Sequence, residues 1–170
     1  MQKIIKDGAI VTDDWVRLSL AEDGTVVNVP QDSDVIVPLA AWLAEPQRWQ
    51  SRVGRTAVWL APDDDPAKLA ASLDRLPLVA VDFPAFADGR GYSIGRLLRE
   101  RYNYAGELRA LGDVGQDQLH YLWQVGFNAF EIKPSQNIEL ALQALARFSE
   151  RYQSTFREPE PLFRRRVTGE

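Results

Sequence analysis

The chain has 170 residues, of which 45% are hydrophobic and 26% charged, a size and composition typical of one globular domain. Its formal net charge of −4 makes nucleic acid an unexpected partner. The lack of cysteine excludes disulfides, thiolate nucleophiles and cysteine-ligated iron–sulfur clusters, and the single histidine, His120, excludes a zinc site built from several histidines of one chain.

The N-terminal sequence MQKIIKDG has no apolar run as long as that of a signal peptide. No other stretch approaches the roughly 18 apolar residues that a membrane-spanning helix needs. We therefore expect a cytoplasmic protein without a membrane partner.

Residues 1–30 are predicted to form a short antiparallel meander. Lys3–Ile5 and Ala9–Thr12 flank an Asp-Gly turn signal, and Trp15–Leu20 and Thr25–Val29 flank a second one that ends in Gly24. Asp-Gly between alternating apolar runs favours a hairpin because both residues tolerate a positive φ.

From residue 34 to 152 the pattern changes to β-branched runs that alternate with helical periodicity, as in parallel βα units. The predicted strands are Val35–Val37, Ala57–Leu60, Leu78–Phe83, Leu108–Leu111 and Ala129–Ile132. The predicted helices are Leu39–Gln50, Pro66–Leu73, Ser93–Tyr102, Gln116–Val125 and Ile138–Tyr152.

Local signals define some of these boundaries. Pro46 is expected to break or kink the first helix. Asp65 followed by Pro66 combines an N-cap with a proline at the first helical position. Residues 155–170, with Arg164–Arg166, are predicted to be an extended tail, so that residues 1–154 form a single α/β domain.

The predicted fold is therefore α/β, an N-terminal antiparallel β-meander followed by about five βα units. Two architectures remain open: a partial (β/α) barrel or an open, mostly parallel sheet. In both, functional residues lie at the carboxyl ends of the strands. Three candidates at those ends are Asp82, Asp113 and Lys133.

The loop after the third of these strands has the composition of an anion site. Its residues are Asp88, Gly89, Arg90, Gly91, Tyr92, Ser93 and Arg96. Ser93 is predicted to cap the following helix, and Arg90 and Arg96 are predicted to converge on the helix N-terminus, where free N–H groups and guanidinium groups bind oxyanions. The alternative is that Arg90 or Arg96 pairs with Asp88 or Asp82 and orders the loop without a ligand.

The same glycines allow a second functional interpretation. Gly89-x-Gly91-x-x-x-Gly95 follows a strand, opens a helix and is followed by Asp113, as in a dinucleotide-binding turn, although the fingerprint has G-x-G-x-x-G spacing. A nicotinamide or flavin would bind there.

His120 lies beside the apolar stripe of its helix and is predicted to be a boundary residue, with general base as the alternative. Four tryptophans are predicted to belong to the core rather than to a stacking platform: Trp42, Trp49, Trp59 and Trp123.

The segment from Leu78 to Ile132, with the block FADGRGYS at its centre, resembles the uncharacterised bacterial family called domain of unknown function 934. Members of that family are commonly encoded beside genes of assimilatory sulfite reduction and are often labelled oxidoreductases. The resemblance implies a role in sulfur assimilation and a partner such as sulfite reductase. It implies no reaction, cofactor or catalytic residue.

Three functions follow as hypotheses. The first is an accessory protein of sulfite reduction whose Arg90/Arg96 loop binds a small oxyanion or a carboxylated partner such as sirohaem. The second is a small oxidoreductase that carries a nicotinamide or flavin, since redox chemistry without cysteine requires a bound cofactor. The third is an interaction module without a small-molecule site. Because five βα units cannot close an eight-unit barrel, the open edges also predict a homodimer.

Overall fold

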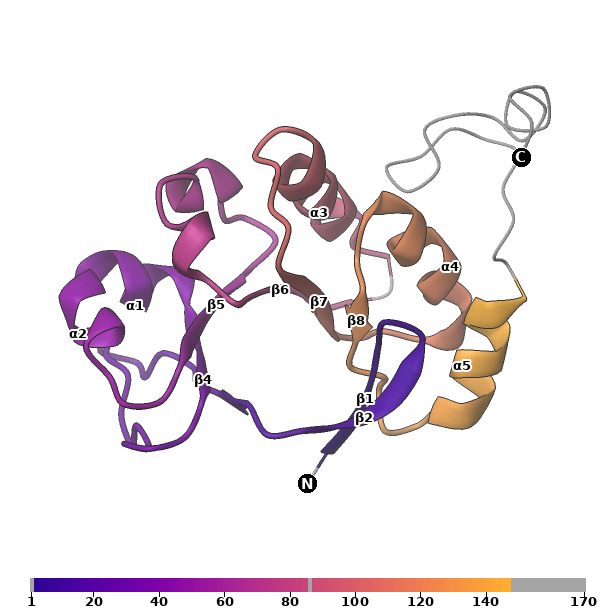
Figure 1. Ribbon diagram of the computed structural model, residues 1–170, viewed down its shortest axis with the longest axis horizontal. Helices are drawn as coiled ribbons and strands as arrows, with labels where there is room; N and C mark the ends of the chain where they lie inside the picture. The colour runs from indigo at the N-terminus through magenta and orange to yellow at the C-terminus, as the bar shows by residue number, and fades with distance from the viewer. Residues whose placement is uncertain (1, 86, 148–170) are drawn as a thin grey trace.

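The computed structural model describes residues 2–85 and 87–147. In this part of the chain eight strands form one curled sheet in the order β2-β1-β8-β7-β6-β5-β4-β3. Figure 1 shows this sheet as a half-barrel with the helices on its outer side. The strands are β1 (Gln2–Lys6), β2 (Ala9–Asp13), β3 (Val16–Arg17), β4 (Val35–Pro38), β5 (Thr56–Leu60), β6 (Leu78–Phe83), β7 (Glu107–Gly112) and β8 (Ala129–Phe130).

Strands β3 to β8 pair in parallel, whereas β1 pairs antiparallel with both β2 and β8. Five α-helices accompany them in the described residues: α1 (Leu39–Ala44), α2 (Pro46–Gln50), α3 (Arg90–Glu100), α4 (Gln116–Val125) and α5 (Ile138–Ala146). The α/β class is confirmed, and of the two predicted architectures the curled half-barrel is a partial barrel.

The hairpin of β1 and β2 forms at the predicted Asp-Gly turn. Asp7 has φ 50° and Gly8 has φ 79°, and Lys6 pairs with Ala9 across the turn. Two consecutive positive φ angles give the turn a twist that matches the right-handed twist of the strands. This part of the predicted meander is confirmed.

The predicted second hairpin is wrong. The Thr25 backbone N–H and hydroxyl both donate to Asp23 Oδ1, at 3.0 and 2.6 Å, and the Ala21 N–H donates to the Thr25 carbonyl. These local bonds fold the segment into a turn, and Thr25–Val29 is not a strand. Val16–Arg17 instead pairs in parallel with β4, so that β3 becomes an edge of the barrel-like sheet.

Several helix boundaries follow the predicted signals. Pro46 separates α1 from α2 and occupies the first position of α2, and Asp65 Oδ1 accepts from the Ala67 N–H at 2.9 Å. However, the predicted helix over 66–73 is two 3-10 turns, η1 (Pro66–Leu69) and η2 (Leu73–Arg75). Helix α5 starts at Ile138 as predicted; its predicted end at Tyr152 and the predicted tail lie outside the described residues.

An apolar layer covers each face of the sheet. The outer layer packs between the sheet and the helices and includes Trp42 and Trp49, which are 3% and 2% exposed. The inner layer fills the concave face with small and branched residues: Ile36, Ala57, Leu78, Ala80 and Leu111, packed against the partly buried Trp15 and Trp59. The chain between β2 and β3 runs from one edge of the sheet to the other and brings Trp15 to this face (Figure 1).

Candidate functional site

The carboxyl ends of the parallel strands gather seven charged side chains at one edge of the half-barrel. Parallel strands place these ends together, and barrel proteins of this kind carry their sites there. We call this group the carboxyl-end rim, and its members are Arg17, Asp63, Asp82, Asp88, Arg90, Asp113 and Lys133.

Arg90 is held by two carboxylates. Asp88 accepts from the Arg90 backbone N–H at 3.1 Å, from Nε at 3.0 Å and from Nη2 at 2.7 Å, and Arg90 Nη1 bonds Asp63 Oδ1. The side-chain hydrogen bond from Arg90 lowers the pKa of Asp88, and the bond to Asp88 raises the pKa of Arg90. The Asp88 carboxylate therefore occupies the N-terminus of α3, where the sequence predicted an external anion.

Two predicted details of this loop are wrong. The residue that precedes α3 is Gly89, so Ser93 lies within the first turn and does not cap the helix. Arg96 lies six residues after Arg90, about 240° around the helix, and does not converge with it. Arg96 Nη1 is 3.5 Å from Glu100 Oε1, a surface pair one turn further along the same helix.

The glycines of the loop are explained by packing. A Cβ on Gly91 would lie 2.5 Å from Cε1 of Phe83, and a Cβ on Gly95 would overlap the ring of Phe127. Neither glycine has a positive φ, and Gly89 has open space around it. The spacing that suggested a dinucleotide-binding turn thus lets α3 approach two aromatic rings, Phe83 at the end of β6 and Phe127 just before β8.

Tyr92 continues this aromatic layer toward the surface. Its ring meets Phe83 edge-on at 5.2 Å between centroids and Tyr121 at 4.9 Å. Burial raises the pKa of the Tyr92 hydroxyl, opposed by a hydrogen bond with Gln118. The Tyr92 phenol is therefore neutral near pH 7 and acts as a packing group with a polar tip.

Asp82 is paired across the concave face. Arg17 Nη2 lies 3.2 Å from Asp82 Oδ1, and its guanidinium carbon lies 4.5 Å from the centroid of the Trp59 ring. Since β3 is separated from β6 by two strands, Arg17 reaches over β4 and β5. Gly112 permits this arrangement, because a Cβ there would lie 2.8 Å from Asp82 Oδ1.

Lys133 and Asp113 form the third pair of the rim, with Nζ 2.8 Å from Oδ1. Beside them the N-terminus of α4 is occupied by side chains of the protein. The Gly115 N–H donates to Gln118 Oε1 at 2.8 Å, and the Gln116 N–H donates to Gln136 Oε1 at 2.5 Å. The first turn of α4 is thus capped internally.

The charged cluster around Arg109 was missed by the sequence analysis. Arg109 is 2% exposed and points to the concave face from the middle of β7. Its Nη2 lies 2.8 Å from Glu107 Oε1 and its Nη1 3.0 Å from Asp13 Oδ1, while Lys6 Nζ lies 3.0 Å from Glu107 Oε2. The signal was present in Glu107-Leu108-Arg109-Ala110, where charged and apolar residues alternate with strand periodicity.

Other candidate features give no site. Among residues 2–85 and 87–147, no three His, Asp or Glu side chains come close enough together to hold a metal ion. Within the same residues, none of the helices combines the length and apolar character required to cross a bilayer. His120 is half-buried on α4, at the boundary of its apolar face as predicted.

Comparison with known proteins adds one match. Residues 57–163 match the model of a family described as "Bacterial protein of unknown function (DUF934)". The matched region contains every residue of the rim except Arg17. No curated protein matches the chain.

Proposed function

The chain belongs to the bacterial family of unknown function DUF934, and from that premise we propose that it is an accessory protein of assimilatory sulfite reduction. Its role is to bind a small oxyanion or a carboxylated molecule at the carboxyl-end rim. The link to sulfite reduction rests on the genes beside which family members are commonly encoded. The binding role rests on the geometry of the rim.

The observation that supports binding is the exposure of the rim cations. The side chains of Arg17, Arg90 and Lys133 are 33%, 55% and 31% exposed, and each is paired with a carboxylate. A partly exposed ion pair stabilises a protein by only about 0–1 kcal/mol. An oxyanion can therefore replace the carboxylate at small cost and form the same contacts.

Arg90 is the best oriented of the three cations. Asp88 and Asp63 together fix its guanidinium at the end of α3, so little side-chain entropy remains to be lost when a ligand binds. Sulfate, sulfite and carboxylate present two oxygens to the guanidinium fork, as Asp88 does. A ligand here competes directly with the Asp88 side chain.

Thermal denaturation in sulfate, sulfite or phosphate, against chloride at equal ionic strength, tests this proposal. A ligand held only by the folded state raises its stability by RT ln(1 + [L]/Kd), about 2.7 kcal/mol at a hundredfold excess over Kd. We expect Arg90→Ala to lose this increment. Arg96→Ala is the matched control, because it removes the same charge from the same helix outside the rim.

Asp88→Asn sharpens the test. It removes the negative charge of the internal competitor and is expected to increase the response to the oxyanion, even though the unliganded protein is less stable. An oxyanion response that Arg90→Ala leaves intact, or that Arg96→Ala lowers equally, contradicts binding at the rim.

The pathway link has its own test. Deletion of the gene is expected to impair growth on sulfate as sole sulfur source, and cysteine should restore growth. Complementation with the Arg90→Ala gene should fail if the rim carries the function, whereas the Arg96→Ala gene should succeed. Normal growth of the deletion strain on sulfate, without a second copy of the gene, contradicts the assignment.

The oxidoreductase hypothesis makes a different prediction for the purified protein. Tightly bound flavin gives a visible absorbance spectrum, and a binding protein for oxyanions is expected to be colourless. A flavin spectrum at near-stoichiometric occupancy would replace the accessory role with the redox role.

A further inference from the structure

A cleft lies at the end of the sheet opposite the carboxyl-end rim, by the amino ends of β5 and β6. It has a volume of about 670 Å³ and lies between the loop that joins α2 to β5 and the segment from η2 to β6. That volume is within the range of small-molecule sites. Its lining includes three arginines, Arg52, Arg55 and Arg75, against one acidic residue, Asp74.

Arg52 is only partly satisfied by the protein. Its Nη2 donates to the carbonyls of Pro30 at 2.7 Å and Ser33 at 2.6 Å, which holds one side of the guanidinium group. Its Nε and Nη1 are buried without a hydrogen-bond partner within the described residues. Buried charged donors without partners cost free energy, so an acceptor that reaches them stabilises the protein.

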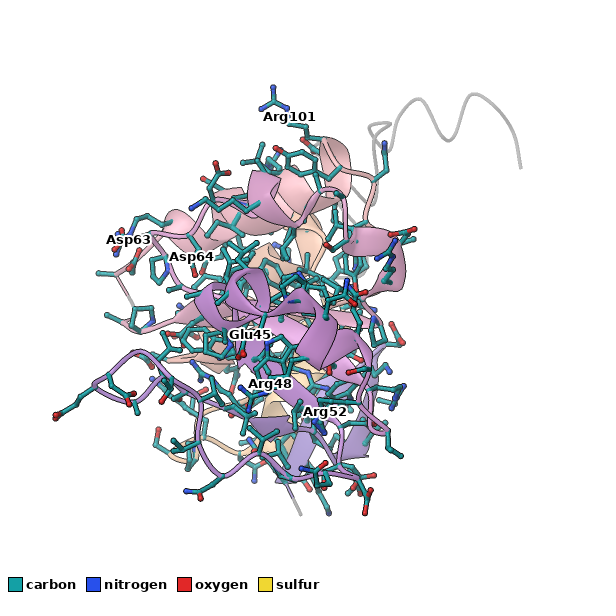
Figure 2. The ribbon with its side chains drawn as sticks, turned by 90° about the vertical axis from the view of Figure 1, so that its left-hand side faces the viewer. Glu45, Arg48, Arg52, Asp63, Asp64 and Arg101 are labelled. Carbon is teal, nitrogen blue, oxygen red and sulfur yellow. The ribbon has the colours of Figure 1, made fainter. Side chains whose placement is uncertain are left out.

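Arg52 also borders a second, smaller hollow. It lines a smaller hollow of about 240 Å³, which shares Trp49 and Val53 with the cleft. Figure 2 shows Arg52 beside Arg48 on the face formed by α1 and α2. Arg52 therefore borders both hollows, and a ligand in the cleft lies next to its guanidinium.

Arg75 is the second available donor. Within the described residues, the Arg75 side chain makes one hydrogen bond: its Nη1 donates to Gln50 Oε1 at 3.5 Å, at the limit of hydrogen-bond distance. By contrast, Arg55 forms an ion pair with Asp34, with Nη2 2.6 Å from Oδ2. Arg52 and Arg75 line the cleft from its two walls.

Part of the remaining lining is apolar. Leu76 and Trp49 are buried in the wall, 4% and 2% exposed, whereas Val53 is 87% exposed at the outer edge of the cleft. An exposed aliphatic side chain beside two arginines suits a ligand that has both a charged head and an apolar body.

We propose that this cleft binds a small organic anion. Its sulfonate, phosphate-ester or carboxylate head contacts Arg52 and Arg75, and its apolar body contacts Leu76 and Val53. The site is independent of the carboxyl-end rim: in Figure 2 Arg52 and Asp63 lie well apart. Failure of one proposal therefore leaves the other standing.

Calorimetric titration with benzenesulfonate tests the site. Separate titrations with inorganic sulfate, which has only the anionic head, and with benzyl alcohol, which has the apolar body without the charge, test each half of the site. We expect saturable binding of benzenesulfonate, weaker binding of sulfate and no binding of benzyl alcohol. Arg75→Gln should raise the Kd for benzenesulfonate about tenfold through the loss of a charge-assisted hydrogen bond. Asp74→Asn should tighten it, because it removes the acidic residue of the lining.

Arg101→Gln is the matched control, because Arg101 is exposed and lies well apart from Arg52 in Figure 2. All titrations use the Arg90→Ala background, so that oxyanion binding at the carboxyl-end rim does not contribute to the measured Kd. The site is refuted by a lack of saturable benzenesulfonate binding, by a Kd insensitive to both Arg75→Gln and Asp74→Asn, or by equal weakening in Arg101→Gln. Equal affinities for sulfate and benzenesulfonate refute the apolar half of the site.

Discussion

Gly95 of α3 lies directly against the aromatic ring of Phe127, with no space between them for a methyl group. One helical turn earlier, Gly91 lies in the same way against the ring of Phe83. The two rings meet edge-to-face with centroids 5.9 Å apart. A pair of glycines four residues apart therefore forms a smooth helix face that matches a pair of aromatic rings.

Gly95→Ala is expected to destabilise the fold. Overpacking costs about 1–3 kcal/mol, and the higher helix propensity of alanine returns up to about 1 kcal/mol. Because the Cβ would overlap Phe127 Cε2, we expect the upper part of the overpacking range, and after the propensity gain a net loss of about 1–2 kcal/mol in the free energy of unfolding, measured by urea denaturation. Gly89→Ala is the control, because no atom lies within 4 Å of a Cβ at that position. Equal stability of the two variants contradicts the packing argument.

Arg99 is a structural arginine that joins α3 to two loops. It is 7% exposed and donates to the carbonyls of Gly126 at 2.9 Å, Tyr104 at 2.7 Å and Gly106 at 2.9 Å. Arg99→Met leaves these buried carbonyls without their donor, which should cost more than about 3 kcal/mol. Arg99→Lys should recover only part of this, because an ammonium lacks the planar fork.

The neighbouring Arg101 provides the comparison for Arg99. It is exposed, and Arg101→Met is expected to change the free energy of unfolding by less than about 0.5 kcal/mol. Chemical denaturation of the three variants measures both effects. An Arg99→Met protein as stable as Arg101→Met would show that the three carbonyls are satisfied in another way.

Local signals predicted the parts of the fold that depend on a few adjacent residues. The Asp7-Gly8 turn, the break at Pro46 and the cap at Asp65 each follow from the conformational preference of one or two residues. The predicted cap at Ser93 is wrong because α3 starts at Arg90, three residues before the predicted start at Ser93. Asp88 Oδ1 accepts from the N–H of Arg90 at this new start.

Contacts between distant strands could not be predicted in the same way. Arg17 meets Asp82, and Arg109 meets Asp13, only because the sheet curls and the chain crosses its concave face. Sequence periodicity shows that a residue lies on one face of a strand but does not show which strand lies opposite. Apart from Arg17, the rim was therefore predicted by its strand ends. Of its ion pairs, Arg90–Asp88 agrees with the alternative that the sequence left open, whereas Arg17–Asp82 and Lys133–Asp113 were not predicted.

Self-association through β2 remains a prediction of the open sheet. In the described part of the chain β2 is an edge strand. Lys6 and Ala9, which close the two-residue turn, form a hydrogen-bonded pair, and hydrogen-bonded and non-hydrogen-bonded pairs alternate along the hairpin. Thr12 is therefore in a non-hydrogen-bonded pair with Lys3, and its N–H points away from β1 toward the open edge of the sheet. Light scattering should report a dimer, and Thr12→Pro, which removes that N–H, should give a monomer.

Thr12→Ala is the control for this substitution, because it keeps the N–H and should remain dimeric. A monomer at high concentration for the unsubstituted protein contradicts the prediction. A dimer that survives Thr12→Pro places the interface elsewhere than on β2.

Tyr104 should make the protein sensitive to alkaline pH. The side chain is 5% exposed, and its hydroxyl donates to the Leu76 carbonyl at 2.8 Å. Burial raises the pKa of this phenol well above its ordinary value near 10, with the nearby Arg99 cation acting in the opposite direction. A raised pKa in the folded state means that the stabilisation is fully present below pH 10 and is lost as the pH rises further.

Tyr104→Phe isolates this contribution. Near pH 7 it should lower the free energy of unfolding by about 1 kcal/mol, because the Leu76 carbonyl loses its donor. Above pH 10 the unsubstituted protein should lose stability more steeply than Tyr104→Phe, so that the difference between them shrinks. Tyr92→Phe removes a less buried phenol whose pKa is also raised and should have a smaller effect on the slope. Urea denaturation between pH 7 and 11 measures these slopes, and parallel curves for the unsubstituted protein and Tyr104→Phe would show that Tyr104 does not titrate on unfolding.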